Sequence, residues 1–186
     1  TAANFAAGGV CGFFVNGTGI VKDCQNFGNV KAMTYASGIC GGSQSGKSVA
    51  TYSYLIEHCT NKGDLSTTNG LGSAGIAGAY SGAVKDCTNY GITDDTHGTA
   101  KSRQYTAGIV ACASYAVDID GCKNYGTVNG VKNVGGIVGN VMKGDAAATV
   151  IKNCVNDAAV NGQDAYVAGI VANSARAEGV VSVANC

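Results

Sequence analysis

Hydrophobic positions in this chain recur at fixed offsets from cysteine rather than with the period of an α-helix. An aliphatic residue lies three positions before each of six cysteines, and the two residues between them are mostly polar. The aliphatic residues are Val21, Ile56, Val84, Ile119, Ile151 and Val183, and the cysteines are Cys24, Cys59, Cys87, Cys122, Cys154 and Cys186. Successive cysteines are 35, 28, 35, 32 and 32 residues apart. Repeats of this length are typical of stacked units that share one continuous core.

A second phrase, roughly Gly-Ile-Val-Gly, recurs in step with the first. Its copies begin at Gly9, Gly38, Gly75, Gly108, Gly136 and Gly169. Another aliphatic residue follows most cysteines by six positions, with Thr93 as the exception. We therefore predict a unit of three short strands: a Gly-Ile-Val strand, a Val-x-x-Cys strand and, after a sharp bend, a third strand. Short strands with one inward face close a core only when they are stacked in parallel.

An asparagine lies two residues after the cysteine in every complete copy. These residues are Asn26, Asn61, Asn89, Asn124 and Asn156. Asparagine tolerates left-handed backbone geometry, and its amide can satisfy nearby backbone groups. Identical amides stacked in register can also bond from one unit to the next as a ladder. We therefore predict a structural asparagine ladder at the bend, with Phe27, Tyr90 and Tyr125 stacked beside it.

Composition supports a β protein. The chain has 29 glycines, which suit repeated corners, and no proline, so every backbone N–H is free to join a sheet. The predicted fold is all-β: one domain, residues 1–186, forming a right-handed parallel β-helix (β-solenoid). It would have about six coils of 28–37 residues with three short strands each, the handedness following the usual rule for parallel crossovers.

The six cysteines at one repeat position form a predicted cysteine column. A buried thiol behaves as a small hydrophobic group, so packing is the first explanation for such a column. Neighbouring coils lie about 4.8 Å apart, which is inside the Cα separation that a disulfide accepts. We expect mostly reduced thiols, and one or two bridges remain an alternative. The total of nine cysteines is odd, so at least one stays unpaired within a monomer.

These phrases resemble the GLUG-type repeats of bacterial surface and secreted proteins. The best copies run from Cys122 to Val128 and from Val84 to Gly91. The resemblance covers nearly the whole chain and implies a β-solenoid in an extracellular or cell-surface protein, often a stalk or adhesive region. The repeat motif is structural, so the resemblance implies no catalytic residues. Lys62 and Asp157 at the aromatic position, and Ala158 in place of glycine, depart from the pattern.

Residues 41–48 match the phosphate-binding P-loop pattern, which requires a helix directly after its lysine. The following residues instead carry the β-forming positions of the repeat, so we favour coincidence over nucleotide binding. Residues 70–75 match the dinucleotide fingerprint without a surrounding βαβ unit.

Other candidate chemistry is sparse. His58 and His97 are too few and too separated for a zinc set, and a packed thiol column explains Cys59 better than a Cys/His nucleophilic pair. The Asp94–Asp95 pair and the Asp118/Asp120 pair lack the spacing of a calcium loop. We expect no enzyme activity, no cofactor and no metal site.

Charge is balanced, with 12 basic and 12 acidic residues. This argues against a nucleic-acid partner. The chain has no apolar stretch near the ~20 residues that cross a bilayer, so we expect no membrane insertion.

Both ends lack the atypical capping units that solenoids usually carry. We therefore expect either a fragment of a longer solenoid or subunits that stack head to tail into a filament.

The leading functional hypothesis is a structural or adhesive extracellular repeat module. Its partners would be further copies of itself, neighbouring domains of a larger surface protein, or glycans. One alternative is a glycan-binding or glycan-active β-helix, which 13% charged residues and no tryptophan disfavour. Another is an ice-binding face, which needs a regular threonine array that the chain lacks.

Overall fold

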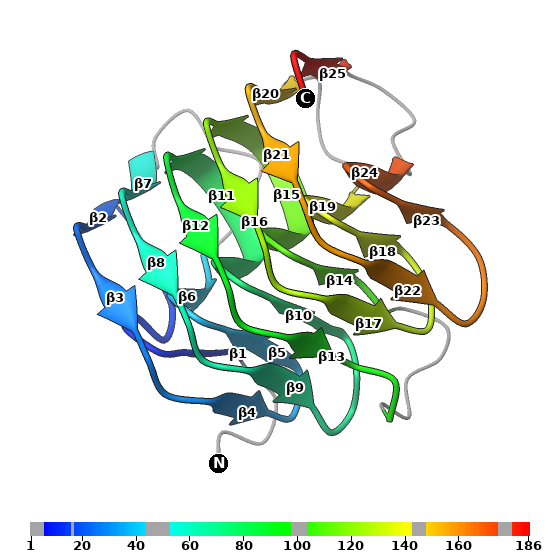
Figure 1. Ribbon diagram of the computed structural model, residues 1–186. Coiled ribbons are helices and arrows are strands. Elements are labelled where there is room, and N and C mark those ends of the chain that lie inside the picture. Colours follow the sequence, from blue (N-terminus) through cyan, green and yellow to red (C-terminus); the bar gives the residue numbers. More distant parts are fainter. Residues whose placement is uncertain (1–5, 16, 44–52, 98–103, 143–147, 175–179) are drawn as a thin grey trace.

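The computed structural model describes residues 6–15, 17–43, 53–97, 104–142, 148–174 and 180–186. In these residues the chain is all-β, with no helix, and winds into a parallel β-solenoid of about five turns. Figure 1 shows the coils stacked side by side, from the first coil in blue to the last in orange and red. No helix in the described part is long and apolar enough to cross a membrane.

Each coil passes in order through four sheets, which we call sheets 1 to 4. Sheet 1 contains β1 (Ala6–Gly8), β5 (Tyr35–Ser37), β10 (Gly72–Ala74), β14 (Thr106–Ala107), β18 (Val134–Gly135) and β23 (Val167–Ala168). Sheet 2 contains β2 (Thr18–Lys22), β6 (Cys40–Gly42), β7 (Ser53–Glu57), β11 (Ala77–Lys85), β15 (Val110–Asp120), β19 (Val138–Val141), β20 (Thr149–Lys152), β24 (Val171–Ser174) and β25 (Val181–Ala184).

The other two sheets are narrower. Sheet 3 contains β3 (Gln25–Asn26), β8 (Thr60–Asn61), β12 (Thr88–Asn89), β16 (Lys123–Asn124) and β21 (Val155–Asn156). Sheet 4 contains β4 (Val30–Ala32), β9 (Leu65–Thr67), β13 (Thr93–Asp94), β17 (Val128–Gly130) and β22 (Val160–Gly162). Sheets 1 and 2 continue to a sixth coil, whereas sheets 3 and 4 have five strands each. The prediction of about six coils was therefore slightly high, because the sixth turn is incomplete.

The coil has four sides where the sequence predicted three strands. The predicted Gly-Ile-Val and Val-x-x-Cys strands share sheet 2, and in β11 and β15 they are one continuous strand. The glycine and isoleucine themselves form the corner between sheets 1 and 2, as Gly75 and Ile76 do between β10 and β11. An additional strand precedes this corner in every coil and builds sheet 1. Its short, small-residue segments carry too weak a pattern to be recognised in sequence.

The corner between sheets 2 and 3 depends on the residue directly before each cysteine of the column. All six of these residues have positive φ angles, between 48° and 65°: Asp23, His58, Asp86, Gly121, Asn153 and Asn185. Aspartate, asparagine and glycine adopt this left-handed conformation most readily. The left-handed bend predicted at the ladder asparagines is not found there, because those residues lie in the extended strands of sheet 3.

Like residues stack above like in the core, as predicted. Val21, Ile56, Val84, Ile119, Ile151 and Val183 pair in register across sheet 2. A second column follows the Gly-Ile corner, where Ile39, Ile76, Ile109 and Ile137 are fully buried. In sheet 4, Val30, Leu65, Thr93, Val128 and Val160 are register partners. The largest apolar cluster of the interior joins the sheet 2 column, the Gly-Ile corner column and the buried cysteines, and Ala74, Ala107 and Ala111 form a second, smaller cluster.

Candidate functional site

The asparagine ladder is present and runs along sheet 3. The Nδ2 of each asparagine donates to the Oδ1 of the asparagine in the next coil, and all four steps measure 2.8 Å. The ladder therefore has a direction, with donors facing the C-terminal end. Because the bonded residues come from consecutive coils, each step joins segments 28 to 35 residues apart.

Each ladder amide also closes the turn that follows it. In the central example, Asn89 Nδ2 donates to the carbonyl oxygen of Gly91 at 3.0 Å, and the Gly91 N–H donates to Asn89 Oδ1 at 3.2 Å. With the two ladder bonds, the Asn89 side chain uses both donors and both acceptor sites. Asn89 is fully buried, so complete satisfaction is what allows an amide to lie here.

The Gly-Ile phrase recurs in step with the asparagine because the two touch. A methyl group on Gly75 would overlap the Asn89 side chain and the carbonyl oxygen of Gly108 in the next coil. Gly38 and Gly108 have the equivalent neighbours in their own coils. The second phrase therefore supplies the bare backbone against which the ladder amide lies, a contact that sequence analysis did not detect.

The cysteine column lies beside the ladder, at the corner between sheets 2 and 3. Cys59, Cys87, Cys122 and Cys154 are fully buried. Each Sγ lies 3.1–3.5 Å from the carbonyl oxygen two residues before it. All nine cysteines belong to the described residues, and all are free thiols. The column is thus a packing feature of reduced thiols in this structure.

Burial and contacts between neighbouring thiols shift the pKa values of the buried cysteines in both directions. Contacts with the Cys154 and Cys87 thiols, together with burial, raise the pKa of Cys122 well above its usual range. Burial raises the pKa of Cys112 to about 12. Since the thiolate is the reactive form, the raised pKa makes Cys122 and Cys112 poor nucleophiles. Hydrogen bonds with the Cys122 thiol lower the pKa of Cys87 and of Cys154. The two ends of the cysteine column are more accessible to solvent, since Cys24 is half-buried and Cys186 is exposed.

A buried carboxylate lies where sheet 4 turns into sheet 1. Asp95 is fully buried and accepts four hydrogen bonds. Its Oδ1 accepts from the backbone N–H (2.9 Å) and the hydroxyl (2.8 Å) of Thr67, and its Oδ2 accepts from the hydroxyls of Ser73 (2.6 Å) and Thr106 (3.1 Å). Burial raises the pKa of Asp95 above its usual range, and the four hydrogen bonds oppose that rise. The four donors engage both carboxylate oxygens of Asp95, so this side chain anchors the corner between sheets 4 and 1.

The outer edge of sheet 3 carries the predicted aromatic column. The rings of Tyr90 and Tyr125 stack at 5.2 Å between centroids with 16° between their planes. The ammonium of Lys62 lies 4.9 Å from the centre of the Phe27 ring. Lys62, which departs from the aromatic pattern in sequence, therefore continues the column through a cation–π contact.

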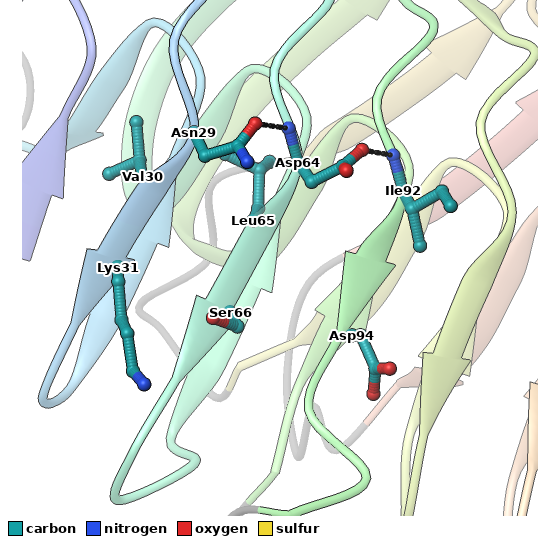
Figure 2. Close-up of a pocket in the computed structure, with 8 residues that line it drawn as sticks. All are labelled: Asn29, Val30, Lys31, Asp64, Leu65, Ser66, Ile92 and Asp94. Atoms are coloured by element: carbon teal, nitrogen blue, oxygen red, sulfur yellow. Dashed lines mark hydrogen bonds between the residues drawn. The ribbon is translucent and has the colours of Figure 1, made fainter.

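A shallow groove runs across the outer side of sheet 4 (Figure 2). Its lining residues are Asn29, Val30, Lys31, Asp64, Leu65, Ser66, Ile92 and Asp94. Two of its polar side chains connect neighbouring coils, since Asn29 Oδ1 accepts from the Asp64 N–H and Asp64 Oδ1 accepts from the Ile92 N–H, both at 2.9 Å. Lys31, Ser66 and Asp94 form one row across three coils because they are register partners. Sequence analysis missed this groove, since only the register brings its residues together.

Charged side chains at the corner before the cysteines are also shared between coils. His58 lies between two carboxylates, with Nδ1 3.4 Å from Asp23 and Nε2 3.7 Å from Asp86. Lys22 pairs with Glu57 at 2.9 Å. These groups are exposed to solvent, which screens their attraction, so each pair contributes little to stability.

The remaining candidates do not form a chemical site in the described part of the chain. No group of three or more histidine, cysteine or acidic side chains there could hold a metal ion. His97 lies far along the chain from His58, and Asp120 pairs with Lys152 at 3.3 Å. Residues 44–48 of the P-loop-like segment lie outside the described residues.

Comparison with protein-family models, with curated proteins and with solved structures finds no match. The likeness to GLUG-type repeats therefore rests on the motifs alone, and the β-solenoid architecture is the level at which this chain is classified.

Proposed function

We propose that this chain is a structural or adhesive repeat module of an extracellular or cell-surface protein, serving as a stiff stalk or spacer. One observation carries the proposal: the side chains that recur from coil to coil make contacts between coils. The asparagine amides bond one another, and a column thiol also reaches the preceding coil, as Cys122 Sγ does in donating to the Val84 carbonyl oxygen at 3.5 Å. Residues conserved from coil to coil in this way serve the stack itself rather than a reaction.

The parallel architecture supports a load-bearing role. The first five coils contact one another through parallel strand pairs in all four sheets, so a force along the stack acts on many hydrogen bonds together. The central ladder step adds a side-chain bond to those of the backbone. The motif resemblance to bacterial surface repeats supports the extracellular location.

The test is to pull the 186-residue chain from both ends between reference domains and record the unfolding force. A load-bearing module is expected to resist as a cooperative unit. Asn89→Ala should unfold at lower force, because it leaves the amide of Asn61 and the Oδ1 of Asn124 without their ladder partner. The control is Asn26→Ala at the first coil, which interrupts one ladder step instead of two. Turnover of any polysaccharide in a panel, or a force no greater than that of an unstructured chain, would contradict the proposal.

Glycan binding is the second candidate, favoured by the groove on sheet 4. Its row of Lys31, Ser66 and Asp94 offers ionic and hydroxyl groups suited to sugar hydroxyls. It ranks second because the residues lining the groove include no aromatic ring on which a sugar could stack. A glycan array tests this candidate. Glycan binding that is lost in Lys31→Ala and in Asp94→Ala would favour glycan binding over the structural role.

A further inference from the structure

Four thiols of the cysteine column form a continuous row through the interior of consecutive coils. They are Cys59, Cys87, Cys122 and Cys154, all fully buried and all free. The residues that directly follow these cysteines are register partners across sheet 3, so each cysteine lies directly opposite the next. The middle of the solenoid therefore holds one buried thiol per coil, with a further thiol in the next coil along.

The four side chains share one orientation. Each Sγ donates to the carbonyl oxygen two residues before it and also lies 3.5–3.9 Å from a carbonyl oxygen of the preceding coil. In the central example, Cys87 Sγ is 3.1 Å from the Lys85 oxygen and 3.8 Å from the Ile56 oxygen. Because the same side chain repeats in the same orientation, neighbouring sulfurs are spaced as the coils are, about 4.8 Å apart.

This spacing matches one metal ion between two sulfurs. A zinc–thiolate bond measures about 2.3 Å, so two bonds of that length placed in line span about 4.6 Å. A disulfide bond of about 2.05 Å would instead require both side chains to leave the common orientation and their carbonyl partners. The gap between neighbouring thiols of the row is therefore suited to a two-coordinate ion that joins one coil to the next.

The surroundings select a soft ion with a single positive charge. Within the described residues no three histidine, cysteine or acidic side chains converge on one point, so the ligand sets of zinc and calcium are not met. Thiolate ligands favour Cu(I), which accepts two sulfur ligands in a line. A buried apolar site also disfavours net charge, and one thiolate neutralises one Cu(I). Hydrogen bonds with the thiols on either side lower the pKa of Cys87, which favours the thiolate that binds metal.

We propose that the row of buried thiols binds Cu(I), with one ion in each gap between neighbouring sulfurs. In a gap, Cu(I) forms two Cu–S bonds and one S–H bond breaks, its proton leaving to solvent. Two thiols and one Cu(I) thus give a neutral RS–Cu–S(H)R unit and one proton, and no electron is transferred. Each inner sulfur bonds one ion on either side, so four thiols take three ions, lose three protons and remain neutral. Bound ions would link successive coils, in addition to the hydrogen bonds of the sheets.

Titration with Cu(I) under nitrogen tests the site. The probe is the Cu(I)–acetonitrile complex, added to the reduced 186-residue chain in competition with bathocuproine disulfonate, whose colour reports the Cu(I) that the protein leaves unbound. The chain is loaded both in the folded state and during refolding from denaturant. We expect an ultraviolet band of Cu(I)–thiolate bonds, luminescence typical of copper shielded from water, and an unchanged β-type circular dichroism spectrum.

The number of ions lost in each variant tests the shared row. Cys87→Ser should bind two ions fewer than the wild type, because it removes the gaps to Cys59 and to Cys122. Cys122→Ser should also bind two fewer. The double variant should bind three fewer and not four, since the gap between the two positions is lost once. Cys112→Ser is the matched control: its thiol is fully buried in sheet 2 outside the row, so Cu(I) binding should not change.

X-ray absorption at the copper edge is the second measurement and needs no variant. The wild type should show two sulfur ligands per copper and no nitrogen or oxygen ligand. A third ligand would overturn the proposal, as would equal Cu(I) binding by the wild type and Cys87→Ser, which indicates adventitious binding elsewhere. A loss of one ion in each single variant would overturn the shared row, and no binding under either loading condition would overturn the site itself. The force measurement is made without metal, so it judges the structural function separately.

Discussion

At the scale of single residues, the solenoid is specified by which polar groups find partners inside it. Asn89 is tolerated in the interior because all four of its hydrogen-bonding sites are used. Thr93 shows the opposite case. It occupies the aliphatic column of sheet 4 between Leu65 and Val128, is fully buried, and its hydroxyl has no hydrogen-bond partner.

Thr93→Val is expected to stabilise the protein. Valine keeps the branched shape and removes a buried hydroxyl whose desolvation is uncompensated, so the free energy of unfolding should rise by about 1 kcal/mol. Chemical denaturation measures it. The matched control is Thr67→Val in the neighbouring strand of sheet 4. This variant loses the 2.8 Å hydrogen bond to Asp95 and should have a lower free energy of unfolding. Equal effects from both variants would contradict the explanation.

Asp95 is expected to make stability depend on pH. Burial raises the pKa of its carboxyl in the folded state, so the folded chain holds the proton more tightly than the unfolded chain does. This contribution is fully present below the unfolded pKa of about 3.9 and is lost as pH rises through the folded pKa. Asp95→Asn cannot titrate. The free energy of unfolding of the wild type, relative to Asp95→Asn, should therefore fall over that range; a rising or flat difference would contradict the assignment.

At the scale of elements, the glycine of the Gly-Ile corner and the ladder asparagine of the same coil form one contact between two separate segments, as Gly75 and Asn89 do. The Gly-Ile corner between sheets 1 and 2 lies against the amide at the start of the turn out of sheet 3. The loop between these segments varies in length from coil to coil without disturbing the contact. Residue types are thus repeated where coils contact one another, whereas segment length varies in the loops between these contacts.

Gly75→Ala tests this packing contact. Its methyl group would overlap backbone and the Asn89 side chain, neither of which can move without breaking coil-to-coil bonds, so we expect a loss of several kcal/mol or failure to fold. Gly169→Ala is the matched control, since it changes the same position of the phrase where nothing lies within 4 Å. Thermal unfolding compares the two. A similar loss in both variants would show that backbone conformation, and not the contact, requires glycine.

At the scale of the whole molecule, the fold is a one-dimensional array. Each coil contacts its immediate neighbours, so stability is close to a sum of coil and interface contributions. Segments far apart in the sequence are joined in this way in every sheet. Such an array should tolerate the loss of one whole unit better than the loss of part of one.

Deleting residues 88–122 should therefore leave a shorter folded solenoid. The deletion joins Cys87 to Lys123, so the chain passes from sheet 2 into sheet 3 as before. We expect a β-type circular dichroism spectrum with a lower free energy of unfolding. Deleting only residues 106–122 joins the entry of sheet 1 to sheet 3 and should abolish cooperative unfolding. If the full-coil deletion fails as well, the coils are not equivalent units.

The repeat pattern alone was enough to predict the parallel solenoid, its aliphatic columns and the asparagine ladder. These follow from the sequence because each depends on residues that recur at one offset, and stacking places equal offsets above each other. The four-sided cross-section was not predicted, because sheet 1 is built from short segments of small residues with no strong periodicity. The groove on sheet 4 was missed for a related reason, since Lys31, Ser66 and Asp94 share no residue type and meet only through register.

The sequence by itself determined that like residues stack, since a period repeated in the chain becomes a column when coils lie in register. Only the tertiary structure decided where the chain bends and what each column touches. The left-handed residue proved to be the one before the cysteine, and the glycine of the second phrase proved to make room for the amide. Asp95 became an anchor only when Thr67, Ser73 and Thr106 came from three different coil segments to meet it. Contacts of this kind join residues that do not recur at one fixed distance from the repeat cysteine, so the repeat pattern does not predict them.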